Sequence, residues 1–459
     1  MNDDKTFLGT EPVGKLLFRL AIPTLTAQII NMLYNIVDRI YIGHIPGDGA
    51  LALTGVGVCM PLIMIVSAFA ALVGFGGAPR ASIFMGRKDN ETAEKILGNC
   101  FSAQLIISLL LTVTLLLGNR TFLLAFGASE NTISYAVSYM NIYAVGTLFV
   151  QLTLGMNAFI TAQGFAKTGM VSVLIGAVCN IILDPIFIYV LGFGVRGAAI
   201  ATVISQALST LWVLSFLLGR RTILKLRPKN MILSPDIILP CLALGLAHFV
   251  MQASESIISV CFNSSLLRYG GDIAVGAMTI LTSVMQFAML PLQGFGQGAM
   301  PIMSYNYGAR SRERVRGAFR LLLKINMIYA CSLWLLIMLF PQIFAGMFTS
   351  DPTLLAFTKT VLCIYVAAMF LFGIQTACQI SFTSLGNAKA SIIVAVMRKF
   401  VLLIPLIYLL PHILTGNQVY AVYLAEPIAD TIAVTFTAFF FSRQFKQTMR
   451  EIEPDGRKK

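Results

Sequence analysis

The chain has 459 residues, of which 57% are hydrophobic and only 12% are charged. A soluble domain usually carries about 25% charged residues, so this composition excludes an ordinary soluble enzyme or binding module. Its long apolar runs indicate a helical protein that crosses the membrane many times, rather than an outer-membrane barrel built from short alternating strands. The formal net charge of +13 fits basic loops on one side of a membrane. No soluble basic domain is apparent that would bind nucleic acid.

Apolar runs of about 20 residues, separated by Gly, Pro and charged clusters, predict transmembrane helices. The residues before the first run are too acidic for a signal peptide, so we expect the first helix to be retained. The eight cysteines show no spacing typical of a metal or redox site. We expect twelve helices, at residues 15–44, 52–80, 93–118, 131–160, 168–191, 197–219, 236–268, 274–303, 315–341, 353–382, 390–412 and 416–443.

Basic residues are distributed unevenly among the predicted loops. If the N-terminus is cytoplasmic, the even-numbered loops hold 14 Lys and Arg residues and the two tails hold eight, a total of 22. The odd-numbered loops hold three, namely Arg120, Arg196 and Arg268. Cytoplasmic loops of membrane proteins are enriched in Lys and Arg, so the count predicts that both termini are cytoplasmic.

The sequence contains an internal repeat with an offset of 222 residues. In "GFGGAPRASIFMGRKD" and "GQGAMPIMSYNYGARS", five positions match, and these are Gly74, Gly76, Pro79, Ser82 and Gly86 with Gly296, Gly298, Pro301, Ser304 and Gly308. The same offset aligns Gly164–Lys167 with Gly386–Lys389. Because each half has an even number of helices, the halves are parallel repeats around an axis along the membrane normal, with a central cleft between them. We predict a six-helix lobe at 1–218, a cytoplasmic linker at 219–234, and a second six-helix lobe with a cytoplasmic tail at 235–459.

The first predicted helix carries a polar stripe. Gln28, Asn31, Asn35 and Asp38 follow a 3–4–3 spacing, which places them within an arc of about 80°, and Tyr34 flanks them. Single Asn or Gln side chains often join helices to one another. A stripe that ends in a carboxylate favours a water-accessible interior instead, because a charge at the bilayer centre costs about 2.5–3.5 kcal/mol on insertion scales.

The fifth and sixth predicted helices carry a second polar group. Asn180 and Asp184 are four residues apart, and Pro185 loosens the backbone hydrogen bonding beside them. Ala198 and Thr202 are also four apart, near the start of the next helix. Each pair therefore lies on one face of its helix.

Asp38, Asp184 and Thr202 all lie about 8–13 Å below the predicted outer surface, given a rise of about 1.5 Å per residue. Their carboxylate and hydroxyl oxygens, with the Asn180 amide and the Ala198 carbonyl, would suit Na⁺, and the carboxylates could carry H⁺ instead. The alternative is a buried hydrogen-bond network that joins three helices.

The second half places polar groups differently along the predicted cleft. We expect substrate contacts from residues on helices 7, 8, 10 and 11, namely Gln252, Glu255, Ser256, Gln286, Gln375, Gln379 and Arg398, together with Gln28, Asn31, Tyr34 and Asn35 of helix 1. Arg398 could instead pair with Glu426 or Asp430 of helix 12. Methionines at 251, 285 and 289 would make the cleft adaptable to varied ligands. The chain lacks a nucleotide-binding P-loop, so we expect an ion gradient as the energy source.

These patterns resemble the MATE (multidrug and toxic compound extrusion) family, and its MepA-like bacterial branch in particular. The resemblance rests on "YNIVDRIYIG", "QGFAK" and "CNIILDPIFIYVLGFGVRGAAIAT", and it covers nearly the whole chain. It implies drug export by two rocking lobes, a cation site at Asp38, Asn180, Asp184, Thr202 and the Ala198 carbonyl, and an acid on helix 7 at Glu255. Some branches pair that acid with one on helix 10, where this chain has Gln375 and Gln379.

We therefore expect an all-α integral membrane protein that exports amphiphilic, often cationic compounds by antiport with Na⁺ or H⁺. It would be a monomer in the bacterial inner membrane, surrounded by lipid, with no enzymatic activity, no bound cofactor and no nucleic-acid partner. The alternative function is a flippase for lipid-linked oligosaccharides from the same superfamily. A flippase would need a lateral opening to lipid and a cationic patch for pyrophosphate, for which only Arg398 and Lys399 are available in the cleft.

Overall fold

The computed structural model describes residues 6–452, which are almost entirely helical and include no strand. The first half contains α1 (Phe7–Thr10), α2 (Val13–Gly43), α3 (Gly49–Gly86), α4 (Asn90–Ala125), α5 (Ile133–Ala162), α6 (Ala166–Pro185), the π-helix η1 (Ile186–Val190) and α7 (Val195–Leu218). The second half contains α8 (Pro235–Gly308), α9 (Arg312–Leu339), α10 (Pro341–Gly346), α11 (Pro352–Tyr365), η3 (Met369–Leu371), α12 (Phe372–Ser384), α13 (Ala388–Val396), the π-helix η4 (Met397–Leu403), α14 (Ile404–Ile413) and α15 (Gln418–Glu451). A 3₁₀ turn, η2 (Pro228–Asn230), lies between the halves.

The structure accounts for the twelve predicted spans, although one of them is bent and two others belong to one long helix. Ten helices within residues 6–452 are long and apolar enough to cross a membrane, and α11 with η3 and α12 forms an eleventh span that is bent by 44°. The long helix α8 contains a break at Gly271, where φ is 64° and ψ is −161°, so it supplies two spans. The predicted loop near residues 269–273 is therefore a sharp turn at one glycine, which readily adopts positive φ.

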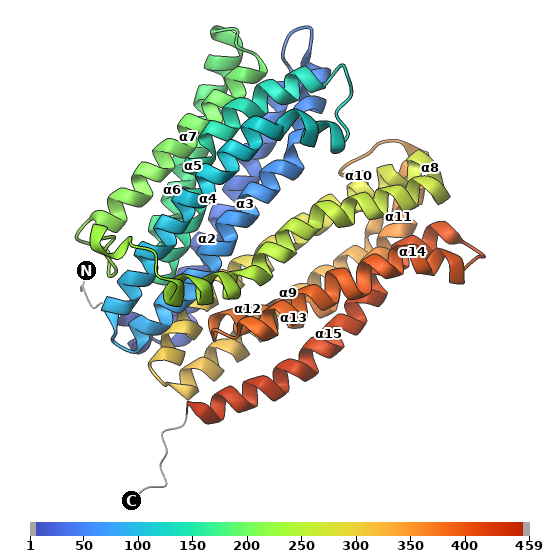
Figure 1. The fold of residues 1–459 in the computed structure, drawn as a ribbon. Coiled ribbons are helices and arrows are strands. Elements are labelled where there is room, and N and C mark those ends of the chain that lie inside the picture. The colour runs from blue at the N-terminus through green and yellow to red at the C-terminus, as the bar shows by residue number, and fades with distance from the viewer. Residues whose placement is uncertain (1–5, 453–459) are drawn as a thin grey trace, which may run out of the picture.

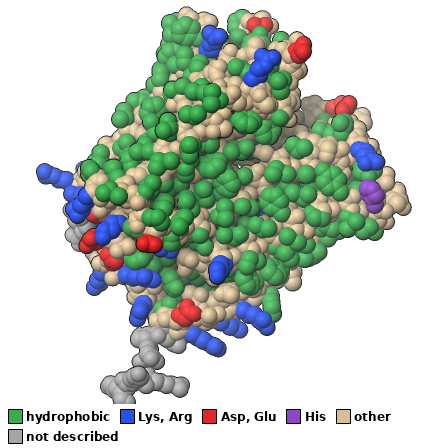
Figure 2. All heavy atoms as spheres, in the orientation of Figure 1, with side chains coloured by type: hydrophobic (Ala, Val, Ile, Leu, Met, Phe, Trp, Pro, Cys, Tyr) green, Lys and Arg blue, Asp and Glu red, His purple; other side chains and the backbone are tan. Residues whose placement is uncertain are grey.

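The helices form two bundles that together make a V (Figure 1). The blue-to-green bundle holds α2 to α7, and the lime-to-red bundle holds α8 to α15. The bundles meet at the end where the chain passes from α7 to α8 and separate toward the other end. Figure 2 shows the surface hollowed between the bundles at that open end.

The internal repeat is visible in the backbone. Within residues 6–452, Lys88 and Arg310 are the two non-glycine residues with positive φ, at 63° and 56°, and they are separated by the repeat offset of 222. Gly164 and Gly386, also separated by 222, have φ of 89° and 74°. Equivalent helices thus end in the same turn geometry in both lobes.

Two repeat-related glycines lie at a close backbone contact between the lobes. A Cβ added to Gly86 on α3 would lie 1.9 Å from the carbonyl oxygen of Tyr305, and one added to Gly308 on α8 would lie 1.9 Å from that of Ile83. Ile83 and Tyr305 are themselves repeat equivalents. The lobes therefore pack backbone to backbone in a two-fold arrangement, which we call the lobe seam.

The N-terminal helix α1 crosses this seam. Its Leu8 carbonyl accepts hydrogen bonds from Asn306 (2.9 Å) and Arg314 (3.1 Å) of the second lobe. Arg314 also donates to the Glu11 carbonyl at 2.6 Å. On its other side, the Phe7 ring packs edge-on against Phe165 of the first lobe. The segment thus fastens the two lobes together at the closed end of the V.

Figure 2 shows hydrophobic side chains covering the flanks of both bundles, while Lys and Arg gather at the end that carries the termini. A broad apolar surface is stable only against lipid or another apolar surface. The chain is therefore a multi-pass membrane protein whose long helices cross the bilayer.

Candidate functional site

The sequence-predicted cation site lies deep in the first lobe, where α2 packs along α6. Asp184 is fully buried near the end of α6, and Asp38 on α2 is 9% exposed. The α-helix ends at Pro185 and continues as the π-helix η1, since proline removes a backbone donor at this point. Single π-helical turns within α-helices occur frequently at functional sites.

The structure brings the four predicted side chains of the cation site together. The Asn180 amide donates to Asp184 Oδ1 at 3.2 Å and to Thr202 Oγ1 of α7 at 3.4 Å. The Asp38 carboxylate faces that of Asp184 closely enough for the two to interact directly. The hydroxyl of Tyr139 on α5, which the sequence analysis missed, lies beside Thr202. Four helices therefore surround one cluster of oxygen atoms.

Three oxygens of this cluster are buried without a hydrogen-bond partner, namely Asp38 Oδ1, Asp184 Oδ2 and Asn180 Oδ1. Buried polar atoms in proteins are almost always paired, with protein or with ordered water, so three converging acceptors form a site that can take up a cation, protons or water. Two facing carboxylates also repel each other unless positive charge lies between them. Hard oxygen ligands of this kind fit a bound Na⁺, while the carboxylates alone fit H⁺.

Ala198 is fully buried on α7, one turn before Thr202. Its carbonyl remains a predicted ligand. Residues 6–452 contain no group of three or more His, Cys, Asp or Glu side chains that could hold a metal ion. A cation at this site therefore needs the amide and hydroxyl oxygens as well as the two carboxylates.

The polar stripe on α2 leads toward this cluster. Asn31 is exposed, while Gln28, Tyr34 and Asn35 are partly buried. Asn35 donates to the Asn31 carbonyl at 2.6 Å, and the Tyr34 ring lies beside both Asn35 and Asp38. The Gln28 amide nitrogen is buried without a partner. Polar groups thus run along α2 from the Asp38 cluster to the exposed Asn31.

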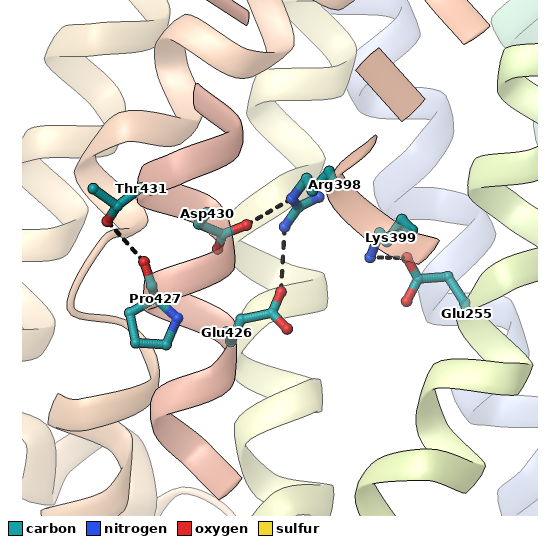
Figure 3. Close-up of polar contacts among 7 residues, drawn as sticks. All are labelled: Glu255, Arg398, Lys399, Glu426, Pro427, Asp430 and Thr431. Carbon is teal, nitrogen blue, oxygen red and sulfur yellow. Dashed lines mark hydrogen bonds and ion pairs between the residues drawn. The ribbon is translucent and has the colours of Figure 1, made fainter. Parts of the chain in front are cut away.

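The second lobe contains a different charged cluster, centred on the π-helix η4 (Figure 3). Arg398 Nε donates to Asp430 at 2.6 Å, and its terminal nitrogen donates to Glu426 at 3.2 Å. The guanidinium also lies 5.0 Å above the Phe372 ring. Both pairings that the sequence suggested for Arg398 therefore occur together, and they bind η4 to α15.

The neighbouring Lys399 pairs in the opposite direction, with Glu255 of α8 at 2.8 Å. The sequence analysis missed this pair. Consecutive side chains on a helix point apart, so Arg398 and Lys399 reach two different helices. The Lys399 side chain is 7% exposed and that of Glu255 is 53% exposed.

The remaining predicted cleft residues occupy two kinds of environment. Gln252 and Ser256 are partly buried on α8, and Gln286 is exposed. Gln375 and Gln379 are buried inside the second lobe, at 8% and 4% exposure. Gln379 donates to the hydroxyl and carbonyl of Ser391, at 2.7 and 3.2 Å. In this conformation Gln375 and Gln379 therefore do not line an open surface.

Comparison with known proteins gives the family. The MatE family model matches residues 23–186 and 247–409, together well over half of the chain. The chain is 24% identical to the multidrug export protein MepA of Staphylococcus haemolyticus, over 95% of both proteins. It also resembles the crystal structure of MATE in the bent conformation, with a TM-score of 0.91 and 24% identity over 98% of this chain and 99% of that one.

A structure described as the outward-facing conformation of a multidrug resistance MATE family transporter has a TM-score of 0.88, with 24% identity over 97% of this chain and 99% of that one. These likenesses confirm the all-helical two-lobed fold. Together with the family match, they show that the chain belongs to the MatE family of multi-pass membrane transporters and is not an enzyme.

Proposed function

We propose that this protein exports amphiphilic, often cationic compounds in exchange for Na⁺ or H⁺. The observation that carries the proposal is the set of three unpartnered buried oxygens where Asp38, Asn180 and Asp184 meet. Such a site takes up a cation or protons, which offset the negative charge of its two carboxylates. The similarity to MepA proteins, which are named as multidrug exporters, supports the same class of activity.

The two lobes supply the second half of the mechanism. We propose that both termini are cytoplasmic, in line with the excess of Lys and Arg at that end (Figure 2), and the C-terminal residue Lys459 lies outside the described residues. The V of Figure 1 is then open to the outside. Export requires exchange with a second state that is open to the cytoplasm, in which the lobe seam separates.

Cation entry and substrate export are coupled if the cation and the substrate stabilise different states of the transporter. Cation entry from outside would offset part of the negative charge of Asp38 and Asp184, and release of the cation inside would reset the site. One monovalent ion moving through a potential of 100 mV provides about 2.3 kcal/mol. At about 1.4 kcal/mol per tenfold change, that supports a gradient of roughly 50-fold for a substrate without net charge. For a monovalent cationic substrate, a one-for-one exchange moves no net charge, so the concentration gradient of the coupling ion must drive export.

Transport by the purified protein in liposomes tests this proposal. Na⁺ and H⁺ gradients are imposed separately, and movement of a cationic dye is followed by fluorescence. We expect one of the two gradients to drive dye against its concentration difference. If neither the Na⁺ nor the H⁺ gradient changes the movement of the dye, the proposal of antiport is refuted.

The alternative, a flippase for lipid-linked oligosaccharides, would need free cationic groups for pyrophosphate. Arg398 and Lys399 are both bonded to carboxylates in this structure. That pairing favours drug export over the flippase. If the protein in the same liposomes translocates a short-chain lipid-linked pyrophosphate but does not move the dye, the flippase function would be favoured over drug export.

A further inference from the structure

The Lys399–Glu255 ion pair is the part of the second-lobe cluster that a ligand could reach. Arg398 already binds two carboxylates and stacks on Phe372. In Figure 3, Lys399 and Glu255 lie to the other side of Arg398, away from Glu426 and Asp430. The half-exposed side chain of Glu255 is the most accessible of the charged side chains in the cluster.

Glu255 lies on the same side of α8 as the residues that contact the first lobe. A Cβ added to Gly245 would meet the Leu72 carbonyl at 1.7 Å, and the His248 and Phe249 rings pack on α3. One to two turns further along the same side come Gln252 and Glu255. At about 1.5 Å per residue, Glu255 lies roughly 10 Å beyond the last of these contacts, where the lobes separate.

The two partners of this pair differ in their freedom to move. Glu255 can turn into the cleft, while the Lys399 side chain, at 7% exposure, stays among packed helices. A ligand ammonium that drew Glu255 away would leave a buried ammonium without a counter-ion, which is strongly unfavourable. A ligand that brings its own carboxylate avoids this cost, because it replaces both members of the pair.

We infer that Lys399 and Glu255 form a paired-charge subsite for amphoteric compounds, with the ligand's positive group at Glu255 and its carboxylate at Lys399. Lys399 would then be the residue that selects amphoteric substrates over simple cations. The inference rests on the proposed function, since it names one substrate class for that export.

The test uses tetramethylrhodamine, which carries a cation and a carboxylate at pH 7.5, and its methyl ester, which keeps only the cation. Binding of each dye to the purified full-length protein is measured by fluorescence polarisation. We expect the wild type to bind the acid more tightly than the ester. Lys399→Gln should weaken binding of the acid at least about tenfold, as expected for a lost hydrogen bond to a charged group, without weakening that of the ester.

Two further variants make the test specific. Lys399→Arg keeps the positive charge and should keep the preference for the acid, and it remains informative if Lys399→Gln does not fold. Lys359→Gln removes an exposed lysine of the same lobe and should change neither affinity.

Equal loss of both dyes in Lys399→Gln, or tighter binding of the ester by the wild type, would overturn the inference. The second result would mean that Lys399 moves to another carboxylate, such as Glu426, when a cation arrives. Export of the ester driven by a gradient would then leave the proposed function intact. Failure to export either dye would instead count against the proposed function itself.

Discussion

Because the lobe seam is packed backbone to backbone, we expect one methyl group added there to shift the equilibrium from the state with a closed seam toward the state with an open seam. In Gly86→Ala the new Cβ would lie 1.9 Å from the Tyr305 carbonyl oxygen, whereas ordinary C···O contacts are about 3.3–3.6 Å. The seam must therefore open by at least about 1.4 Å, and neither backbone can rotate aside. Overpacking of this kind costs about 1–3 kcal/mol. The state with a closed seam should become about 5- to 150-fold less populated relative to one with an open seam.

Distances between spin labels at Glu130 and Ser350 measure this change, because these residues lie in loops at the open end of the two lobes. Labels on introduced non-canonical amino acids leave the eight native cysteines in place. We expect Gly86→Ala to shift the distances toward shorter values. The matched control is Gly57→Ala on the same helix, where an added Cβ meets nothing within 4 Å. If the distance distribution is unchanged in folded Gly86→Ala protein, the seam is not a contact that is closed in one state of the transporter and open in the other.

Three further predictions follow from contacts outside the cation site. Arg314→Gln removes donors to two backbone carbonyls that fasten α1 across the seam, and it should shift the same spin-label distances in the same direction as the added methyl group. Arg398→Met leaves two buried carboxylates without their cation, so it should lower unfolding stability in detergent by about 3–5 kcal/mol, while the same change at exposed Arg320 should have little effect. Hydrogen bonds from the Thr92 side chain and from its backbone amide lower the pKa of Asp89, the N-cap of α4. The stabilising effect of Asp89 should therefore be present above the unfolded pKa and be lost as pH falls through the lower folded pKa. Melting curves of wild type and Asp89→Ala should therefore converge at acidic pH, and a constant difference would contradict this.

Much of the first-lobe site could be predicted because helix geometry alone relates its residues. Asn180 and Asp184 are one turn apart on α6, so they must share a face, and hydropathy places them at the depth of Asp38. The family match confirms the recognition of a MATE transporter, and the structure confirms the fold class. The role of the site as a cation-binding centre stays a prediction.

The second-lobe contacts were less predictable, because they depend on how helices rotate against each other. Lys399 and Glu255 are far apart in sequence, and the π-helix η4 changes the direction of side chains relative to an ideal α-helix. The placement of Gln379 shows the same difficulty, since a glutamine in an apolar helix can face a cleft or bond to a neighbouring helix. Its partner Ser391 lies on α13, and nothing in the sequence links the two positions.

The hydropathy pattern also did not predict where helices end or bend. Apolar length marks the part of a helix within lipid, whereas backbone hydrogen bonding carries α3 on to Gly86 and α15 on to Glu451. The bend between α11 and α12 has no proline beside it that would have indicated it in the sequence.

The most direct test of the account is gradient-driven export by Asp38→Asn, Asp184→Asn and the double variant in liposomes, with dye binding measured on the same preparations. The account predicts that each single variant binds dye but cannot export it against a gradient. The double variant should be no worse than either, because half of a shared site already fails to couple. Export near the wild-type rate by either single variant would contradict the claim that Asp38 and Asp184 form one coupling site.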